Sequence, residues 1–239
     1  MKQLHMPTTK KLYRFMGVSS FVAAIVISLA DFLLEFNKEY GVSTSIVESE
    51  WVNMPDWRFS LSLYLCVFMI PFYILGFWLL YKALSKNNEL FAISIFVLFS
   101  YGVIMGSPLI HGIMSINGVI YKYGINNGLG HELLTDLIAG KLTSTILPVF
   151  IFHYVITWII APIMLFIHIV SGRSIFKRWT AFLNPLVFMI VGFIGLKVLP
   201  TVFVYLTPGS INKGNAALFL LVTAKMWHSD QLKEEGNLL

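Results

Sequence analysis

Long apolar runs dominate this chain and leave it little choice of environment. Six stretches of roughly 15 to 28 residues are poor in charge, and about 20 such residues can cross the hydrocarbon core of a bilayer as a helix. Their bounds are 14–35, 59–82, 90–112, 143–170, 180–199 and 214–228. A seventh crossing is conceivable if 200–211 enters the bilayer. The sequence therefore predicts an all-α, polytopic transmembrane bundle of six helices, or seven.

The composition supports the same class. Hydrophobic residues make up 57% of the chain and charged residues only 12%, whereas a soluble domain carries about 25% charged residues. No polar linker divides the chain, so we expect residues 1–239 to form a single membrane domain. The lone cysteine, Cys66, excludes an internal disulfide, and its apolar surroundings predict a buried, inert thiol.

Basic residues mark one side of the predicted bundle. They precede the first run, join the second run to the third, and join the fourth to the fifth. These residues are Lys2, Lys10, Lys11, Arg14, Lys82, Lys86, Arg173, Lys177 and Arg178. Because loops rich in Lys and Arg stay in the cytoplasm, we predict a plasma (inner) membrane protein with both termini cytoplasmic. Orientation thus explains the net charge of +5, and nucleic acid is not an expected partner.

Polar side chains inside the runs gather at one depth. Such residues are costly within a bilayer and normally face the bundle interior. Span order and a rise of about 1.5 Å per residue place a group of them in the outer half of the membrane. We predict that they line an outward-facing pocket and bind its ligand: Asp31, Arg58, Ser62, His111, His153 and Asn215. For His153, the deepest, a purely structural, hydrogen-bonded role stays open.

The segment GVIMGSPLIHG, residues 102–112, carries unusual residues for an apolar helix. Pro108 removes a backbone donor, and Gly106 and Gly112 loosen the helix around it. We expect the regular hydrogen bonding to break within a turn of Gly106. Such a kink would turn His111 toward the bundle axis.

Three of the polar residues have the chemistry of a zinc site. Asp31, His111 and His153 could supply three ligands and leave a fourth position open, as catalytic zinc requires. Membrane hydrolases of the ceramidase and progestin-receptor-like superfamily use Asp, Ser and three His, but their histidines paired at i and i+4 are missing here. Haem is not favoured, because His153 and His168 point about 60° apart on one helix and only His111 could pair with them.

The order of several segments resembles an uncharacterised bacterial multi-pass membrane family, known as a domain of unknown function. The segments that carry the resemblance are SLADFLL, DWRFSLSLYL, GVIMGSPLIHG, GRSIFKRWTAFLNPL and TPGSINKGNAALFL. The resemblance implies the multi-span architecture over most of the chain. It implies no activity.

Three functions are compatible with these features. The leading one is binding, with or without processing, of a small amphiphile or lipid from the outer leaflet. The first alternative is a membrane-embedded, metal-dependent hydrolase. The second is a non-catalytic protein that binds a protein partner, such as an immunity or assembly factor. The expected partners of the leading function are membrane lipids and a small amphiphilic ligand.

The charge pattern generates a topology test. In a background with Cys66→Ala, Ser43→Cys should react with a membrane-impermeant maleimide added to intact cells, whereas Ser174→Cys should not. The reason is that Ser43 lies in an acidic connection and Ser174 in a basic one. If only Ser174→Cys is labelled, the predicted orientation is wrong and the opposite one holds.

Overall fold

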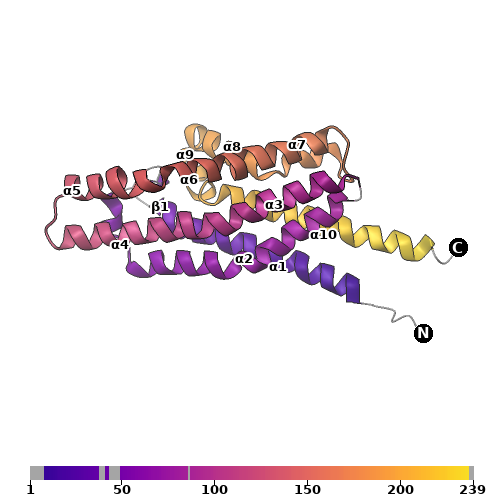
Figure 1. The fold of residues 1–239 in the computed structure, drawn as a ribbon, viewed down its shortest axis with the longest axis horizontal. Coiled ribbons are helices and arrows are strands. Elements are labelled where there is room, and N and C mark those ends of the chain that lie inside the picture. Colours follow the sequence, from indigo (N-terminus) through magenta and orange to yellow (C-terminus); the bar gives the residue numbers. More distant parts are fainter. Residues whose placement is uncertain (1–7, 38–40, 43–48, 86, 237–239) are drawn as a thin grey trace.

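Long helices run nearly side by side in this protein (Figure 1). The structure is a computed structural model that describes residues 8–37, 41–42, 49–85 and 87–236. The predicted all-helical class is confirmed, apart from a hairpin of two short strands, β1 (Phe36–Asn37) and β2 (Gly41–Val42). The strands pair antiparallel, with Phe36 opposite Val42.

The first two expected crossings are the helices α1 (Thr8–Glu35) and α2 (Asp56–Ser85). A 3₁₀ turn, η1 (Ser49–Val52), precedes α2. The 28 residues of α1 rise about 42 Å, more than the roughly 30 Å of the hydrocarbon core. The two helices pack against each other over most of their length, and α1 also packs on the last helix.

The third expected crossing is one helical path with a π-helical turn in it. It consists of α3 (Glu89–Gly106), the π segment η2 (Ser107–Gly112) and α4 (Ile113–Asn126). Pro108 has no N–H and its ring crowds the carbonyl four residues earlier, which disfavours regular α-helical hydrogen bonding at this point. The predicted break near Gly106 is thereby confirmed, in the form of a wider turn.

The fourth crossing is also longer than expected. Its path runs through α5 (His131–Thr135), η3 (Asp136–Thr143), α6 (Ser144–Tyr154), η4 (Val155–Ile160) and α7 (Ala161–Val170), with π-helical turns at η3 and η4. Its first piece, α5, is continuous with the rest of the path, and a tight turn at Gly128, with φ of 82°, connects it to α4.

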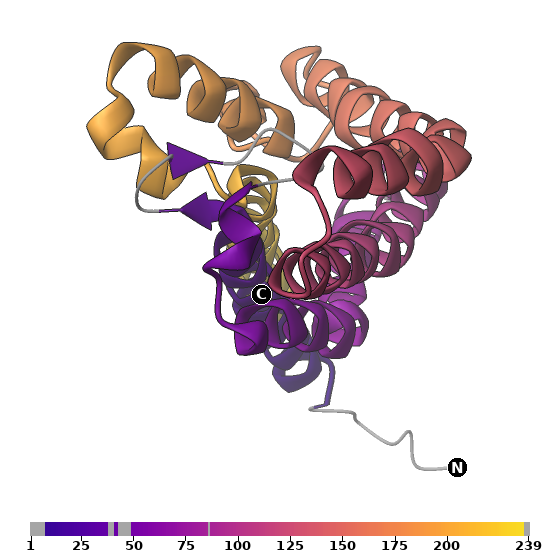
Figure 2. The same ribbon diagram turned by 90° about the vertical axis from the view of Figure 1, so that its left-hand side faces the viewer.

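The last part of the chain is built from shorter pieces. After a 3₁₀ turn, η5 (Arg178–Phe182), come α8 (Pro185–Val198) and α9 (Pro200–Leu206). The chain then turns at Gly209, with φ of 66°, into α10 (Ser210–Gly236). Seen end-on in Figure 2, α8 and α9 lie to one side of α10, and the α5–α7 path lies to the other.

Four of the described helical stretches are long and apolar enough to cross a membrane. They are Lys11–Glu35, Asp56–Ser85, Glu89–Asn126 and His131–Val170. These stretches give the chain the character of an integral membrane protein. Full crossings by α8 and α10 remain predictions, because the 14 residues of α8 rise only about 21 Å.

The basic segments gather at one end of the bundle. The start of α1, the end of α2 and the end of α10 lie together there (Figure 1). The Asn87 amide donates a hydrogen bond to the Arg173 carbonyl at 3.0 Å, which joins the α2–α3 turn to the basic loop after α7. This arrangement is what the topology prediction requires, while the cytoplasmic location of this end remains a prediction.

Two hydrophobic clusters fill the bundle. The larger one lies toward the basic end and includes Tyr73, Phe77 and Phe219. The smaller one, which we call the outer cluster, consists of Leu34, Trp51, Met54, Phe59, Tyr121, Leu134 and Ile138. In it the Trp51 ring meets two aromatic neighbours edge-on, each with centroids 6.3 Å apart. The candidate site lies between the two clusters.

Close packing of α2 on α10 generates a stability prediction. A Cβ added at Gly76 would lie 2.5 Å from the Phe219 ring, whereas one at Gly112 would meet Leu63 at an ordinary 3.7 Å. Gly76→Ala should therefore lower the thermal unfolding temperature of the detergent-solubilised protein, with a cost of about 1–3 kcal/mol. Gly112→Ala is the matched control and should not. Equal unfolding temperatures for the two variants would contradict the packing of these helices.

Candidate functional site

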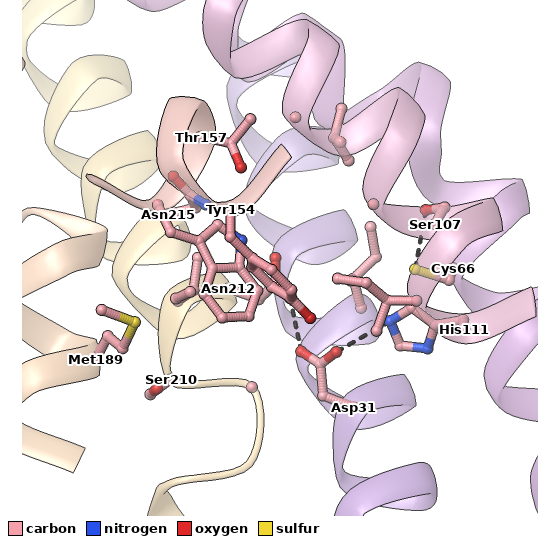
Figure 3. A pocket seen from close by; sticks show the side chains of 18 of the residues that line it. Asp31, Cys66, Ser107, His111, Tyr154, Thr157, Met189, Ser210, Asn212 and Asn215 are labelled. Carbon is pink, nitrogen blue, oxygen red and sulfur yellow. Dashed lines mark hydrogen bonds and ion pairs between the residues drawn. The ribbon is translucent and has the colours of Figure 1, made fainter. Parts of the chain in front are cut away.

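A cavity of about 390 Å³ lies at the centre of the bundle (Figure 3). Its walls come from α1, α2, α3, η2, α6, η4, α8 and α10, and most of the lining side chains are apolar or aromatic. Polar side chains concentrate around one part of it, where α1, η2 and α10 approach one another (Figure 3). The cavity is therefore amphipathic, whereas the sequence analysis predicted a polar, outward-facing pocket.

An Asp–His pair forms the centre of the polar part. His111 Nε2 lies 3.0 Å from Asp31 Oδ1, and both residues are buried. The second carboxylate oxygen, Oδ2, accepts a hydrogen bond from the Asn212 amide at 2.6 Å. Three elements are thus joined through one carboxylate: α1 by Asp31, η2 by His111 and α10 by Asn212.

The hydrogen bond at the other ring nitrogen of His111, Nδ1, determines how the Asp31–His111 pair is protonated. Ser62 Oγ lies 2.8 Å from His111 Nδ1 and donates its hydrogen to the Ala30 carbonyl at 2.8 Å. Because a hydroxyl has one hydrogen and a carbonyl can only accept, Ser62 accepts from Nδ1–H. One further proton then lies between His111 Nε2 and Asp31. Whichever atom holds it, the pair has a net charge of zero.

A second layer of polar groups supports this pair. The Tyr73 hydroxyl donates to Asn212 Oδ1 at 2.5 Å, which orients the amide toward Asp31. Cys66 Sγ lies 3.0 Å from Ser107 Oγ and beside the His111 ring (Figure 3). Cys66 is buried, as expected, but it lines the cavity.

Two cavity residues carry buried polar atoms that the protein does not satisfy. His153 Nδ1 and Asn215 Oδ1 have no hydrogen-bond partner in the part of the chain that the structure describes, although only 1% and 5% of these residues is exposed. The His153 ring packs close to the backbone of α3, since a Cβ at Gly106 would lie 3.4 Å from its Nε2. A buried polar atom without a partner is costly, so each is a candidate contact for a ligand.

The predicted site residues divide into two groups. Asp31, His111, His153 and Asn215 line the cavity. Ser62 lies behind His111, and the Arg58 guanidinium donates to the carbonyls of Leu33 and Phe36 at 2.8 and 2.6 Å. Arg58 therefore caps the end of α1, where partial negative charge accumulates. Whether any of these residues binds a ligand remains a prediction.

Sequence reasoning missed several residues of the lining. They are Glu35, Cys66, Tyr73, Tyr154 and Asn212. A helical spacing could have revealed some of them, because residues 62, 66 and 73 share one face of α2. Asn212 lies just before the expected sixth run, at a depth that hydropathy alone does not mark.

The expected metal ligands do not form a metal site. Among residues 8–37, 41–42, 49–85 and 87–236, no three His, Cys, Asp or Glu side chains are grouped so that they could hold a metal ion. The zinc set of Asp31, His111 and His153 is therefore not assembled. The physical reason is that both ring nitrogens of His111 are already hydrogen-bonded.

The two histidines should differ in their effect on stability. Replacing His111 with Leu leaves one partner of a buried pair alone and should cost about 3–5 kcal/mol. Replacing His153 with Phe retains a ring of similar shape and should cost less than about 1.5 kcal/mol. Thermal unfolding of both variants in detergent measures the difference. Equal destabilisation would show that His153 has a structural role.

Comparison with known proteins places the chain in a family. No curated protein and no solved structure matches it. The model of a family of unknown function, DUF6796, matches residues 1–229. This match spans nearly the whole length of 239 residues. The chain is therefore a member of this family of unknown function.

Proposed function

We propose that this protein binds a small amphiphile or lipid in its central cavity. The polar group of the ligand would lie at the Asp31–His111 pair, and its apolar part among the aromatic walls. The observation that carries the proposal is the combination of a cavity of about 390 Å³ with buried polar atoms that lack partners. Small-molecule sites of about 300–1,000 Å³ typically combine apolar walls with a few placed polar groups.

The route into the cavity supports an amphiphile over a water-soluble ligand. One wall comes from α8, through Met189 and Phe193, and the facing wall from α6 and η4, through Tyr154 and Trp158. Apart from its neighbour α9, α8 packs chiefly against α10 and little against the α6–α7 path. We place the entrance between α8 and this path, where a membrane lipid would enter sideways. The outer cluster closes the bundle beyond Glu35.

The arrangement around the pair favours binding over a serine-type reaction. Ser62 is fully buried, gives its hydrogen to Ala30 and does not line the cavity. It is therefore a support for His111 and not a nucleophile that a substrate could reach. The proposal includes the plasma membrane location with both termini cytoplasmic, on the basis of the charge pattern.

A larger side chain inside the cavity should strongly weaken the binding of an amphiphile. Val103 lines the cavity, whereas Val97 on the same helix is 54% exposed on the outer surface. Val103→Phe should lower the affinity for an amphiphile at least about tenfold, because the added ring occupies the space that the ligand would fill. Native mass spectrometry of protein released from membranes measures the bound molecules. Val97→Phe is the matched control and should retain them.

The single cysteine provides an independent readout. Cys66 lines the cavity and is the chain's only cysteine, so alkylation by N-ethylmaleimide reports how accessible the cavity is. A bound amphiphile should slow this alkylation. If amphiphiles of every head group leave both the alkylation rate and the mass spectrum unchanged, the proposed function is wrong.

A further inference from the structure

We infer that the polar part of the cavity selects an ammonium group, so that the ligand is an amphiphilic primary amine and not a phosphate or carboxylate lipid. This inference rests on the proposed function and names the class of its ligand. It follows from the charges and the hydrogen-bond acceptors on the cavity wall.

The described part of the cavity wall has carboxyl groups but no Lys or Arg. Asp31 and Glu35, one helical turn apart on α1, both line it. The absence of Lys and Arg holds for the lining residues within 8–37, 41–42, 49–85 and 87–236. Arginine and lysine are the usual partners of phosphate and carboxylate groups. An anionic head group would therefore meet the net-neutral Asp31–His111 pair and the Glu35 carboxyl group, with no Lys or Arg among the described lining residues.

The nearby cations are directed elsewhere. The Arg58 guanidinium is bound to the carbonyls at the end of α1, as described above. The Lys213 ammonium donates to the carbonyls of Leu206 and Pro208 at 2.7 and 2.8 Å and is not part of the lining. His111 does not add a net positive charge, because its proton is balanced by Asp31. Lys213 still interacts electrostatically with Asp31 and Glu35 from outside the lining. Among the described lining residues, however, no Lys or Arg faces the Glu35 carboxyl group.

Two of the lining residues also carry buried atoms that would suit a donor. Asn215 Oδ1 can only accept a hydrogen bond, and it is buried without a partner. His153 Nδ1 can accept one when the ring is neutral. A primary ammonium has three N–H donors for such acceptors. The Tyr154 and Trp158 rings, with centroids 4.1 Å apart, add aromatic faces that attract a cation.

Four amphiphiles with the same chain length test the inference. The protein is placed in uncharged lipid nanodiscs and its Cys66 alkylation rate is measured with dodecylamine, dodecyltrimethylammonium, laurate or dodecanol. Dodecylamine should bind at least about tenfold more tightly than laurate or dodecanol, since hydrogen bonds to charged groups are worth that much or more. Dodecylamine should also bind more tightly than dodecyltrimethylammonium, which has the positive charge but no N–H.

Two variants locate the head group. Glu35→Gln and Asn215→Leu should each weaken dodecylamine binding by about tenfold and weaken dodecanol binding much less, because a neutral hydroxyl has one donor and no charge. Retained dodecanol binding shows that the cavity of each variant is intact. Asp56→Asn is the matched control, because Asp56 is an acid outside the cavity, 2.6 Å from Lys122. It should bind dodecylamine as the unaltered protein does.

The outcomes separate the inference from the proposed function. If all four amphiphiles protect Cys66 equally, or laurate protects it best, the inference is overturned and the proposed function stands. If the quaternary amine equals dodecylamine, the role of the N–H donors is overturned. If none of the four protects Cys66, both proposals fall.

Discussion

A buried carboxylate within a membrane-spanning helix imposes the strongest constraint on this structure. Asp31 is only 8% exposed, so little water can solvate its carboxylate, and an ionisable group in such a helix is costly. It is tolerated because His111 and Asn212 each bind one of its oxygens. Those partners come from η2 and α10, which are far apart in the chain. The positions of three helical elements therefore depend on the solvation of one side chain.

The supporting groups are arranged outward from this pair. Ser62 holds the far nitrogen of His111, and Tyr73 holds the far oxygen of Asn212, both from α2. The π-helical turn η2 contributes as well, since it carries His111 and Ser107 on a widened turn. Such turns occur often at functional sites, because the extra residue re-aims neighbouring side chains. The cavity lies between these polar elements and the aromatic side chains that pack on either side of them.

The sequence predicted the fold class and the level of the site along the helices better than it predicted the contacts within the site. Apolar runs of helical length are a strong signal, and Pro108 correctly located the change in hydrogen bonding. Hydropathy could not show that the third and fourth helical paths continue past the apolar runs, because residues 113–142 are amphipathic and pair with each other through the outer cluster. The grouping of Asp31 with His111 followed from depth alone. Depth could not show that Arg58 turns to the end of α1, since that choice depends on which carbonyls lie within reach.

The proposed entrance between α8 and the α6–α7 path would have a consequence for how this protein responds to its ligand. A molecule that arrives sideways is presented at its mole fraction in the bilayer, not at its concentration in water. Each methylene adds about 0.8 kcal/mol to membrane partitioning, which is about a fourfold enrichment. The apparent potency of added amphiphiles would then rise with chain length even without a new contact in the cavity. Occupancy would report the composition of the membrane itself.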